Sequence, residues 1–370
     1  MAVTINQTPS NWSPSDNPLM FRFSSTQTAQ PNFSYIVETY YNSLKVSEDR
    51  LFVEVGNYAH IDVSPIVKNL LNTPQQTIPL FGNAATNGSI YVKVIENYGT
   101  IPINQANATS ATIKIFKACL SDKMWKSWDA SEWVENKYLT NYPELTEMYQ
   151  QFGAPFYLSA IMDGSFNLSI SFYDINDVLL DSYTETQTRV IAQLNLSTDS
   201  LQVNTTIPDI NIVHYYIVEL GSILKKVYLQ KAECNPIQSL SWINEYGVWD
   251  SFIFSHNIER KGSVTERMYG KKFGNWVGTN FNYNLDQAGN IRVGTQQTDS
   301  ATIYTGWISQ TLQNWLIELF KAPRFYLYTN EIESVRVTSS AFSYEQSRFE
   351  DLISQAVDIE FTNNNNGISL

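Results

Sequence analysis

The sequence contains very little of the chemistry that enzymes and metal proteins use. It has only two cysteines, Cys119 and Cys234, so a disulfide scaffold is excluded and a reducing compartment is expected. Its three histidines, His60, His214 and His256, stand in separate regions with no carboxylate or cysteine at metal-ligand spacing. We therefore expect no metal site and no cofactor.

Catalytic motifs are missing as well. There is no Gly-x-Ser-x-Gly elbow and no glycine-rich loop opening a helix to hold phosphate. Two carboxylate pairs, Asp174 with Asp177 and Glu245 with Asp250, are the kind that a glycosidase needs. The Asp174–Asp177 segment, however, has the composition of a turn between strands. The sequence predicts a protein that is not an enzyme and has no catalytic residue.

Basic clusters and long apolar runs are also absent. The chain has 24 Lys and Arg against 36 Asp and Glu, a formal net charge of -12, without the basic stripe that phosphate neutralisation requires. No run is apolar over the length of a bilayer, and the N-terminal residues lack the basic and apolar parts of a secretion leader. We expect a soluble protein made in a cytoplasm, with no direct nucleic-acid partner and no membrane span.

What the sequence does contain is aromatic residues in alternating runs. Its 22 Tyr, 19 Phe and 9 Trp favour pleated strands and interfaces, and 370 residues exceed one ordinary core. The prediction is a mainly β fold, with tandem β-sandwich-like domains followed by a C-terminal α+β domain. The predicted parts are a first sandwich at 1–120, an aromatic-rich linker at 121–153, a second sandwich at 154–235 and the α+β domain at 236–370.

Local patterns predict several elements of the two sandwiches. Alternating runs at 18–23 and 33–40, joined by turn residues, predict a hairpin. A short helix is predicted within 62–71, with Ser64 as cap and Pro65 in its first turn. The predicted closing strands, at 113–119 and 227–234, both end in Lys-Ala followed by a cysteine. This parallel suggests that the second sandwich arose by duplication of the first.

Tryptophans mark two further segments. Trp125, Trp128 and Trp133 lie in the linker, which we expect to pack in the cleft between its two domains. Trp242 and Trp249 lie in a predicted pair of strands that pivots on Gly247, where glycine permits a close backbone approach. These two can pack in the core or stack on a sugar, and core packing is favoured. All five tryptophans are candidates for subunit interfaces.

The last third of the chain changes character. A charged run at 259–267 is followed by a predicted helix that ends before Pro323. Its apolar residues have the spacing of one buried helix face: Leu312, Trp315, Leu316, Leu319 and Phe320.

Three segments together resemble a known group of proteins. They are 242–254, the opening residues 18–35, and 314–327 with its sequence NWLIELFKAPRFYL. They are similar to uncharacterised virion proteins of tailed bacteriophages that infect Bacteroidota. The similarity extends to Glu266-Arg267-Met268-Tyr269 and to a closing strand at 357–361. No enzymatic residues come with this resemblance.

The resemblance implies a structural place in a virion assembled in the bacterial cytoplasm, as a tail, baseplate or neck subunit. The expected partners are copies of itself and other virion proteins, and function would reside in subunit interfaces. The alternative is a receptor-recognition module that binds a host-surface glycan through aromatic and amide side chains. A third reading is a tail enzyme that cleaves polysaccharide.

Overall fold

The computed structural model is mainly β and consists of several separate sheets, as the sequence predicts. Two compact units are found: residues 1–231 with 242–251, and residues 232–241 with 252–370. The first unit holds both predicted sandwiches and the linker, and the finer boundaries stay predictions. The structure describes residues 3–54, 56–72, 81–83, 87–143, 147–188, 191–207, 209–230, 238–254, 258–270, 275–282, 290–329, 331–339, 352–362 and 365–366.

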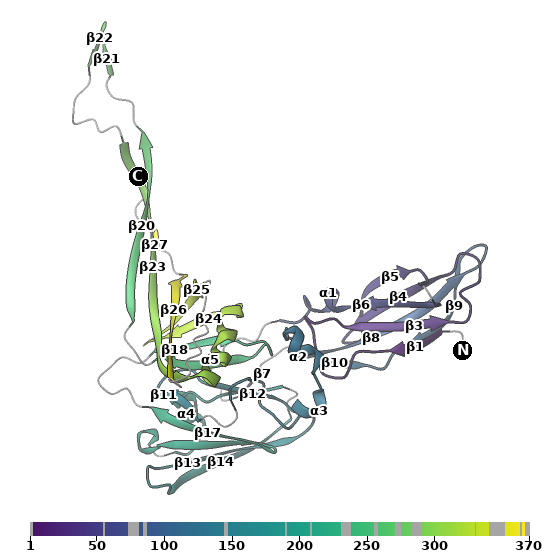
Figure 1. Ribbon diagram of the computed structural model, residues 1–370, viewed down its shortest axis with the longest axis horizontal. Helices are drawn as coiled ribbons and strands as arrows, with labels where there is room; N and C mark the ends of the chain where they lie inside the picture. The colour runs from purple at the N-terminus through teal and green to yellow at the C-terminus, as the bar shows by residue number, and fades with distance from the viewer. Residues whose placement is uncertain are drawn as a thin grey trace. The chain divides into compact units, whose positions relative to one another are not determined.

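The first sandwich packs a three-stranded sheet against a larger one (Figure 1). The smaller sheet has the order β1 (Val3–Gln7), β3 (Met20–Ser25), β6 (Tyr58–Asp62). The larger has the order β2 (Ser13–Pro14), β10 (Ile113–Phe116), β8 (Asn87–Tyr98), β4 (Ser34–Tyr41), β5 (Leu44–Leu51), and β9 (Ile103–Thr109) also pairs with β8. Their core combines Phe21 and Phe23 of one sheet with Tyr35, Val37 and Val92 of the other.

Two local predictions in this sandwich are wrong. The runs at 18–23 and 33–40 fall on β3 and β4, but these strands belong to opposite sheets and are not a hairpin. The turn between them carries the chain across the sandwich, which lets both strands bury a face in one core. Helix α1 (Ser64–Val67) forms with Pro65 in its first turn, but Ser64 does not cap it. Instead the Asp62 Oδ1 accepts the Ser64 N–H at 2.9 Å.

The second sandwich repeats the strand order of the first. Its larger sheet runs β11 (Met148–Gln151), β17 (Ile223–Gln230), β16 (Tyr215–Leu220), β13 (Phe166–Tyr173), β14 (Leu179–Gln187). In each sandwich the closing strand, β10 or β17, pairs antiparallel with a long central strand, β8 or β16, and parallel with a short early strand, β2 or β11. The shared order supports the expected duplication. Cys234, part of the sequence parallel, lies outside the described residues.

The smaller sheet of the second sandwich includes one strand that comes from the part of the chain that forms the first sandwich. It has the order β12 (Tyr157–Ile161), β15 (Ile191–Asn195), β7 (Phe81–Asn83). Strand β7 is donated from the connection between β6 and β8, and it pairs antiparallel with β15. The remaining helical turns of this unit are short: α2 (Asp122–Lys126), α3 (Ala130–Trp133), α4 (Thr198–Asn204) and η1 (Ile210–Ile212). The two sandwiches therefore share a backbone connection as well as the linker.

The second unit is built on one large sheet. Its order is β19 (Trp249–Phe254), β18 (Gln238–Ile243), β24 (Phe325–Tyr328), β25 (Ile332–Val337), β26 (Leu352–Phe361), β23 (Asn290–Ser309), β20 (Glu259–Gly270), and β27 (Asn365–Asn366) pairs with β23. A separate small hairpin consists of β21 (Asn275–Val277) and β22 (Asn280–Asn282). Residues 242–251 include the facing ends of β18 and β19, and they cluster with the first unit.

The predicted C-terminal helix is confirmed. It begins as α5 (Gln310–Leu316), continues as the 3-10 helix η2 (Ile317–Lys321) and stops before Pro323. The Ser309 hydroxyl accepts the Leu312 N–H and caps it. Leu312, Trp315, Leu316 and Leu319 are buried, and Phe320 is half-buried, as the spacing predicts.

Candidate interface surfaces

The three linker tryptophans lie in a cluster that joins the two sandwiches. Trp125, Trp128 and Trp133 are half-buried against Phe116 from the first sandwich and Ile161 from the second. The Trp128 indole N–H donates to the Trp12 carbonyl oxygen at 3.1 Å. The Trp128 and Trp133 rings are 5.7 Å apart, centre to centre. Packing in the cleft is thus confirmed, and most of this aromatic surface is used within the chain.

Trp242 and Trp249 are not on the surface. Their exposed fractions are 0% and 1%, so neither side chain can contact a partner while the chain is folded. Both belong to strands whose residues are almost all buried. Of the two readings for this segment, core packing and sugar stacking, the structure shows core packing.

The turn between these strands is held by a buried polar network. The Asn244 Oδ1 accepts the N–H groups of Tyr246 and Val248, at 3.0 and 3.3 Å. Its amide nitrogen donates to the Leu139 carbonyl oxygen at 2.8 Å and to Asp250. Gly247 has φ +71°, and a Cβ there would stand 1.7 Å from the Lys117 carbonyl oxygen. The close approach expected at this glycine is confirmed, and the carboxylates of Glu245 and Asp250 accept hydrogen bonds within the chain.

The second unit contains a long exposed hairpin, which we call the arm: β20 paired with β23 over residues 259–270 and 290–302. All twelve residues of β20 are exposed. Strand β26 pairs with β23 over Ser300–Ser309, and β27 pairs with it at Gln296 and Gln297. Toward Asn290, beyond these partners, the arm continues as a two-stranded ribbon (Figure 1). The sequence was interpreted at 259–267 only as a charged run. Its Thr-, Ser- and Gln-rich partner at 295–300 was the missed signal.

The β21–β22 hairpin lies in sequence between the two arm strands and carries an aromatic pair. Trp276 and Phe281 are directly opposite in register, and their rings are 5.4 Å apart. Trp276 is 72% exposed and Val277 and Phe281 are also exposed. Gly278 opens the two-residue turn with φ +64°, the conformation that such turns require. This short segment presents three large apolar side chains to solvent.

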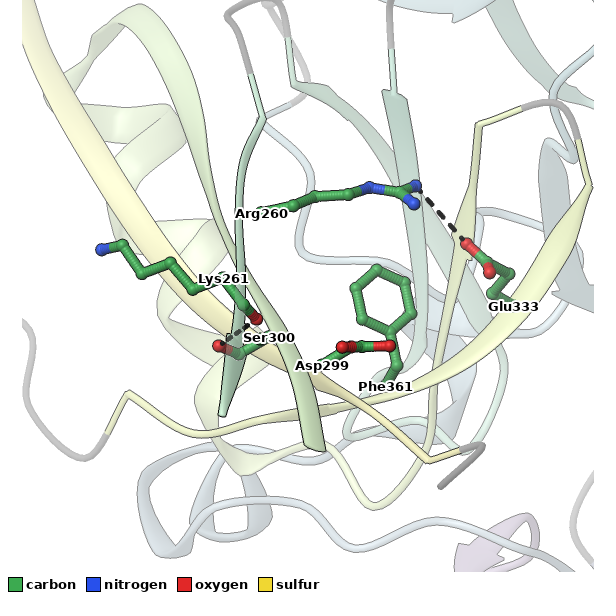
Figure 2. A pocket seen from close by; sticks show the side chains of 7 residues that line it. Arg260, Lys261, Asp299, Ser300, Glu333 and Phe361 are labelled. Atoms are coloured by element: carbon green, nitrogen blue, oxygen red, sulfur yellow. Dashed lines mark hydrogen bonds and ion pairs between the residues drawn. The ribbon is translucent and has the colours of Figure 1, made fainter. Parts of the chain in front are cut away.

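A hollow of about 370 Å³ lies at the base of the arm (Figure 2). The Arg260 guanidinium spans it, 3.9 Å from the Glu333 carboxylate and 5.3 Å from the centre of the Phe361 ring. On the opposite strand the Ser300 hydroxyl donates to the Lys261 carbonyl oxygen at 3.2 Å. Arg260, the second residue of β20, thus connects the base of the arm to β25 and β26.

A second exposed edge belongs to the β13–β14 hairpin of the second sandwich. The Asp174 carboxylate accepts the N–H groups of Val178 and Asn176, and these bonds lower its pKa. This confirms the predicted turn. Ile175, Val178 and Leu179 are exposed beside it. Residues 166–187 contain four Asp or Glu and no Lys or Arg, so this edge is acidic.

A groove of about 660 Å³ runs beside Trp133 in the first unit. Lys137 and Lys225 lie on its wall, with ammonium groups 5.5 Å from the Trp133 ring and 5.3 Å from the Tyr142 ring. Asn136 and Asn141 supply amides. The groove combines cations, amides and aromatic rings.

The described residues contain no cluster of three or more His, Cys, Asp or Glu that could hold a metal ion. The His60 Nδ1 contacts Glu54 on the surface, and His214 packs edge-on against Tyr215 and Tyr228. His256 lies outside the described ranges. Within those ranges no helix is long and apolar enough to cross a membrane.

No protein-family model and no curated protein matches this sequence. Among solved structures, the chain is similar to an I9–I11 tandem from titin, with 11% identity and a TM-score of 0.16, covering 63% of this chain and 66% of that one. It is also similar to a marsupial T cell receptor, with 8% identity and a TM-score of 0.22, covering 81% and 96% of the two chains. TM-scores this low do not establish a common fold.

Proposed function

We propose that this chain is a structural subunit of a tailed-bacteriophage virion, in the tail, baseplate or neck, and that it acts through subunit contacts made by its arm. The observation that carries the proposal is the arm itself. Its strand β20 exposes all twelve residues, and the hairpin at 275–282 exposes an aromatic pair. The sequence resemblance to virion proteins of phages of Bacteroidota supports the phage assignment.

Among the described strands, only β23 pairs with β20, so most of the arm is not covered by its own chain. A two-stranded ribbon is marginally stable in water unless another surface covers it. An exposed strand edge also tends to pair with another chain, because its outward N–H and C=O groups have no strand beside them. The arm therefore has the properties of an element that is completed by a neighbour. Such a partner would be a copy of this chain or another virion protein.

The test is the place and copy number of the chain in purified particles. The expected result is many copies per particle, recovered with tail or neck fractions after gentle disruption. A variant in which Asn-Gly replaces residues 264–297, joining the register partners Ser263 and Thr298, should fold but fail to enter particles. Recovery of the chain only as a free monomer, or normal incorporation of the variant, would contradict the proposal.

A second candidate is recognition of a host-surface glycan. The groove beside Trp133 favours it, because Lys137 and Lys225 could pair with the carboxylates of an acidic polysaccharide while the Trp133 and Tyr142 rings lie beside them. A glycan array with the full chain tests this. Saturable binding lost in a Lys137→Ala, Lys225→Ala variant would support it, and no binding to any acidic glycan would exclude it.

A further inference from the structure

We propose that the arm adds its free edge to the second sandwich of a neighbouring copy, so that β20 of one chain pairs with β14 of the next. This inference rests on the proposed function and names the partner of the same surface. It identifies a second copy of this chain, and within it one strand, as the receptor of the arm.

The edge of the arm is available for backbone pairing. Strand β20 is the terminal strand of its sheet, and among the described strands only β23 pairs with it. In an antiparallel ladder, alternate residues direct their N–H and C=O groups away from the one partner. Alternate residues along the twelve of β20 therefore offer a template for an added strand, the mode called β-augmentation.

Charge favours another copy of this chain as the source of that strand. The two arm strands, 259–270 and 290–302, contain four Lys or Arg and three Asp or Glu, a net charge of +1. The rest of the chain then holds 20 basic and 33 acidic residues, a net charge of -13. The arm is therefore a basic segment on an acidic protein, and complementary charge steers it toward the body of another copy.

Strand β14 fits this arm better than two comparable edges, β11 and β5. It is nine residues long, whereas β11, at the opposite edge of the same sheet, has four. Its hairpin carries only acidic charges, and Leu179 at its start is 53% exposed. Opposite it, the arm exposes Val264 and Met268, which could cover such apolar surface.

The equivalent edge of the first sandwich, β5, offers a useful contrast. It occupies the same place in the strand order as β14. Its charges are already balanced, because Lys45 bridges Glu38 and Glu48 at 2.6 and 2.5 Å. Charge thus distinguishes two edges of similar length and exposure.

A contact between β20 and β14 joins two different surfaces, so it is head-to-tail. Such contacts build a ring when the rotation closes and a filament when it does not. Both outcomes suit a tail or neck subunit. A basic arm with an exposed Trp276 could instead approach an anionic membrane, and that outcome is included in the test.

The experiment is disulfide trapping between two populations of full chain, in a Cys119→Ser, Cys234→Ser background. One population carries Ser263→Cys or Thr265→Cys on β20, and the other carries Ser182→Cys or Thr184→Cys on β14, all at exposed positions. A disulfide dimer is expected only when the two are mixed. Glu48→Cys on β5 replaces the β14 cysteine as the matched control, and it should trap little.

A charge swap provides the second readout. Asp181→Lys with Glu185→Lys on β14 should weaken self-association roughly tenfold or more, because like charges then face the arm. Arg260→Glu with Arg267→Glu on the arm should weaken it similarly. Mixing the two variants should restore association, which a simple folding defect would not do.

The outcomes separate the two proposals. Oligomers in sedimentation without β20–β14 trapping would overturn the pairing and leave the proposed function intact. A chain that stays monomeric at all concentrations and shows no trapping would overturn both. Binding of the full chain to phosphatidylglycerol vesicles, lost in the short-arm variant and without any trapping, would replace the neighbouring copy with a membrane.

Discussion

Gly247 lies against Lys117 so closely that a Cβ at position 247 would stand 1.7 Å from the Lys117 carbonyl oxygen. Its φ of +71° is also unfavourable for any residue with a Cβ. Gly247→Ala should therefore lower the free energy of unfolding by roughly 3 kcal/mol or more, since backbone must move. Urea or thermal denaturation measures it.

The matched control is Gly294→Ala in the arm. A Cβ there would meet nothing within 4 Å. Its effect on unfolding should stay within about 0.5 kcal/mol. Equal stability of the two variants would show that the turn at 247 does not dock on residue 117.

The aromatic pair of the β21–β22 hairpin, Trp276 and Phe281, should matter for association and not for folding. Trp276→Ser removes a side chain that is 72% exposed, so the unfolding midpoint should not change. If a neighbour buries this indole, association should weaken by about 2–3 kcal/mol, which is roughly 30- to 150-fold. Sedimentation velocity over a concentration series would measure it.

Trp307→Ser is the corresponding control, because Trp307 is 69% exposed and stands on β23 outside the arm. It should leave association within about twofold of the unchanged chain, well below the difference expected at Trp276. Identical association of the unchanged chain and the Trp276 variant would remove the aromatic pair from the interface.

Arg260 should determine how firmly the base of the arm is held against β25 and β26. Its pair with Glu333 is long, at 3.9 Å, and both side chains are partly exposed, so Arg260→Ala should change global stability by less than about 1 kcal/mol. Amide hydrogen exchange in β20 should nevertheless become faster near residue 260, because the contact with Phe361 is lost. Lys261→Ala, on the opposite face, should not change it. No change in exchange for Arg260→Ala would contradict this role.

Alkaline pH should destabilise the first sandwich. Burial, with Glu96 nearby, raises the pKa of Tyr35 to about 12. In the unfolded chain this phenol ionises near pH 10, so the stability it contributes is complete below pH 10 and is lost as pH rises toward 12. Between these pH values, one such group should lower the free energy of unfolding by about 1.4 kcal/mol per pH unit.

Denaturation at several pH values between 10 and 12 checks this expectation. Tyr35→Phe should reduce the alkaline slope, because the replaced ring has no proton to lose. Its hydroxyl donates only a long hydrogen bond, 3.4 Å to the Asn57 carbonyl oxygen, so the variant should remain folded. An unchanged slope would show that another group controls alkaline unfolding.

Patterning predicted the parts of the fold that depend on local periodicity. The α5 face, the Asp174 turn and the close approach at Gly247 are each encoded in a few neighbouring residues. Sheet membership is not local: β3 and β4 look like a hairpin in sequence, yet the core separates them into two sheets. The pairing of β7 with β15 could not be predicted from local sequence either, because the two strands are about a hundred residues apart in the chain.

The candidate surfaces were harder to predict than the fold. The tryptophan pattern predicts Trp242 and Trp249 as interface candidates, but both side chains are buried in the core. The arm has few large apolar residues along β20, and its exposure follows from the absence of a covering layer, which composition does not reveal. The hairpin at 275–282, with Trp276 and Phe281 paired beside a Gly-Thr turn, was not predicted either.

The most direct measurement is a density map of the intact particle in which this chain is located. The account predicts repeated copies with each arm covered by protein of an adjacent subunit, and β20 extending a sheet of its neighbour. Arms that project uncovered into solvent, or a particle that holds no copy of the chain, would contradict it.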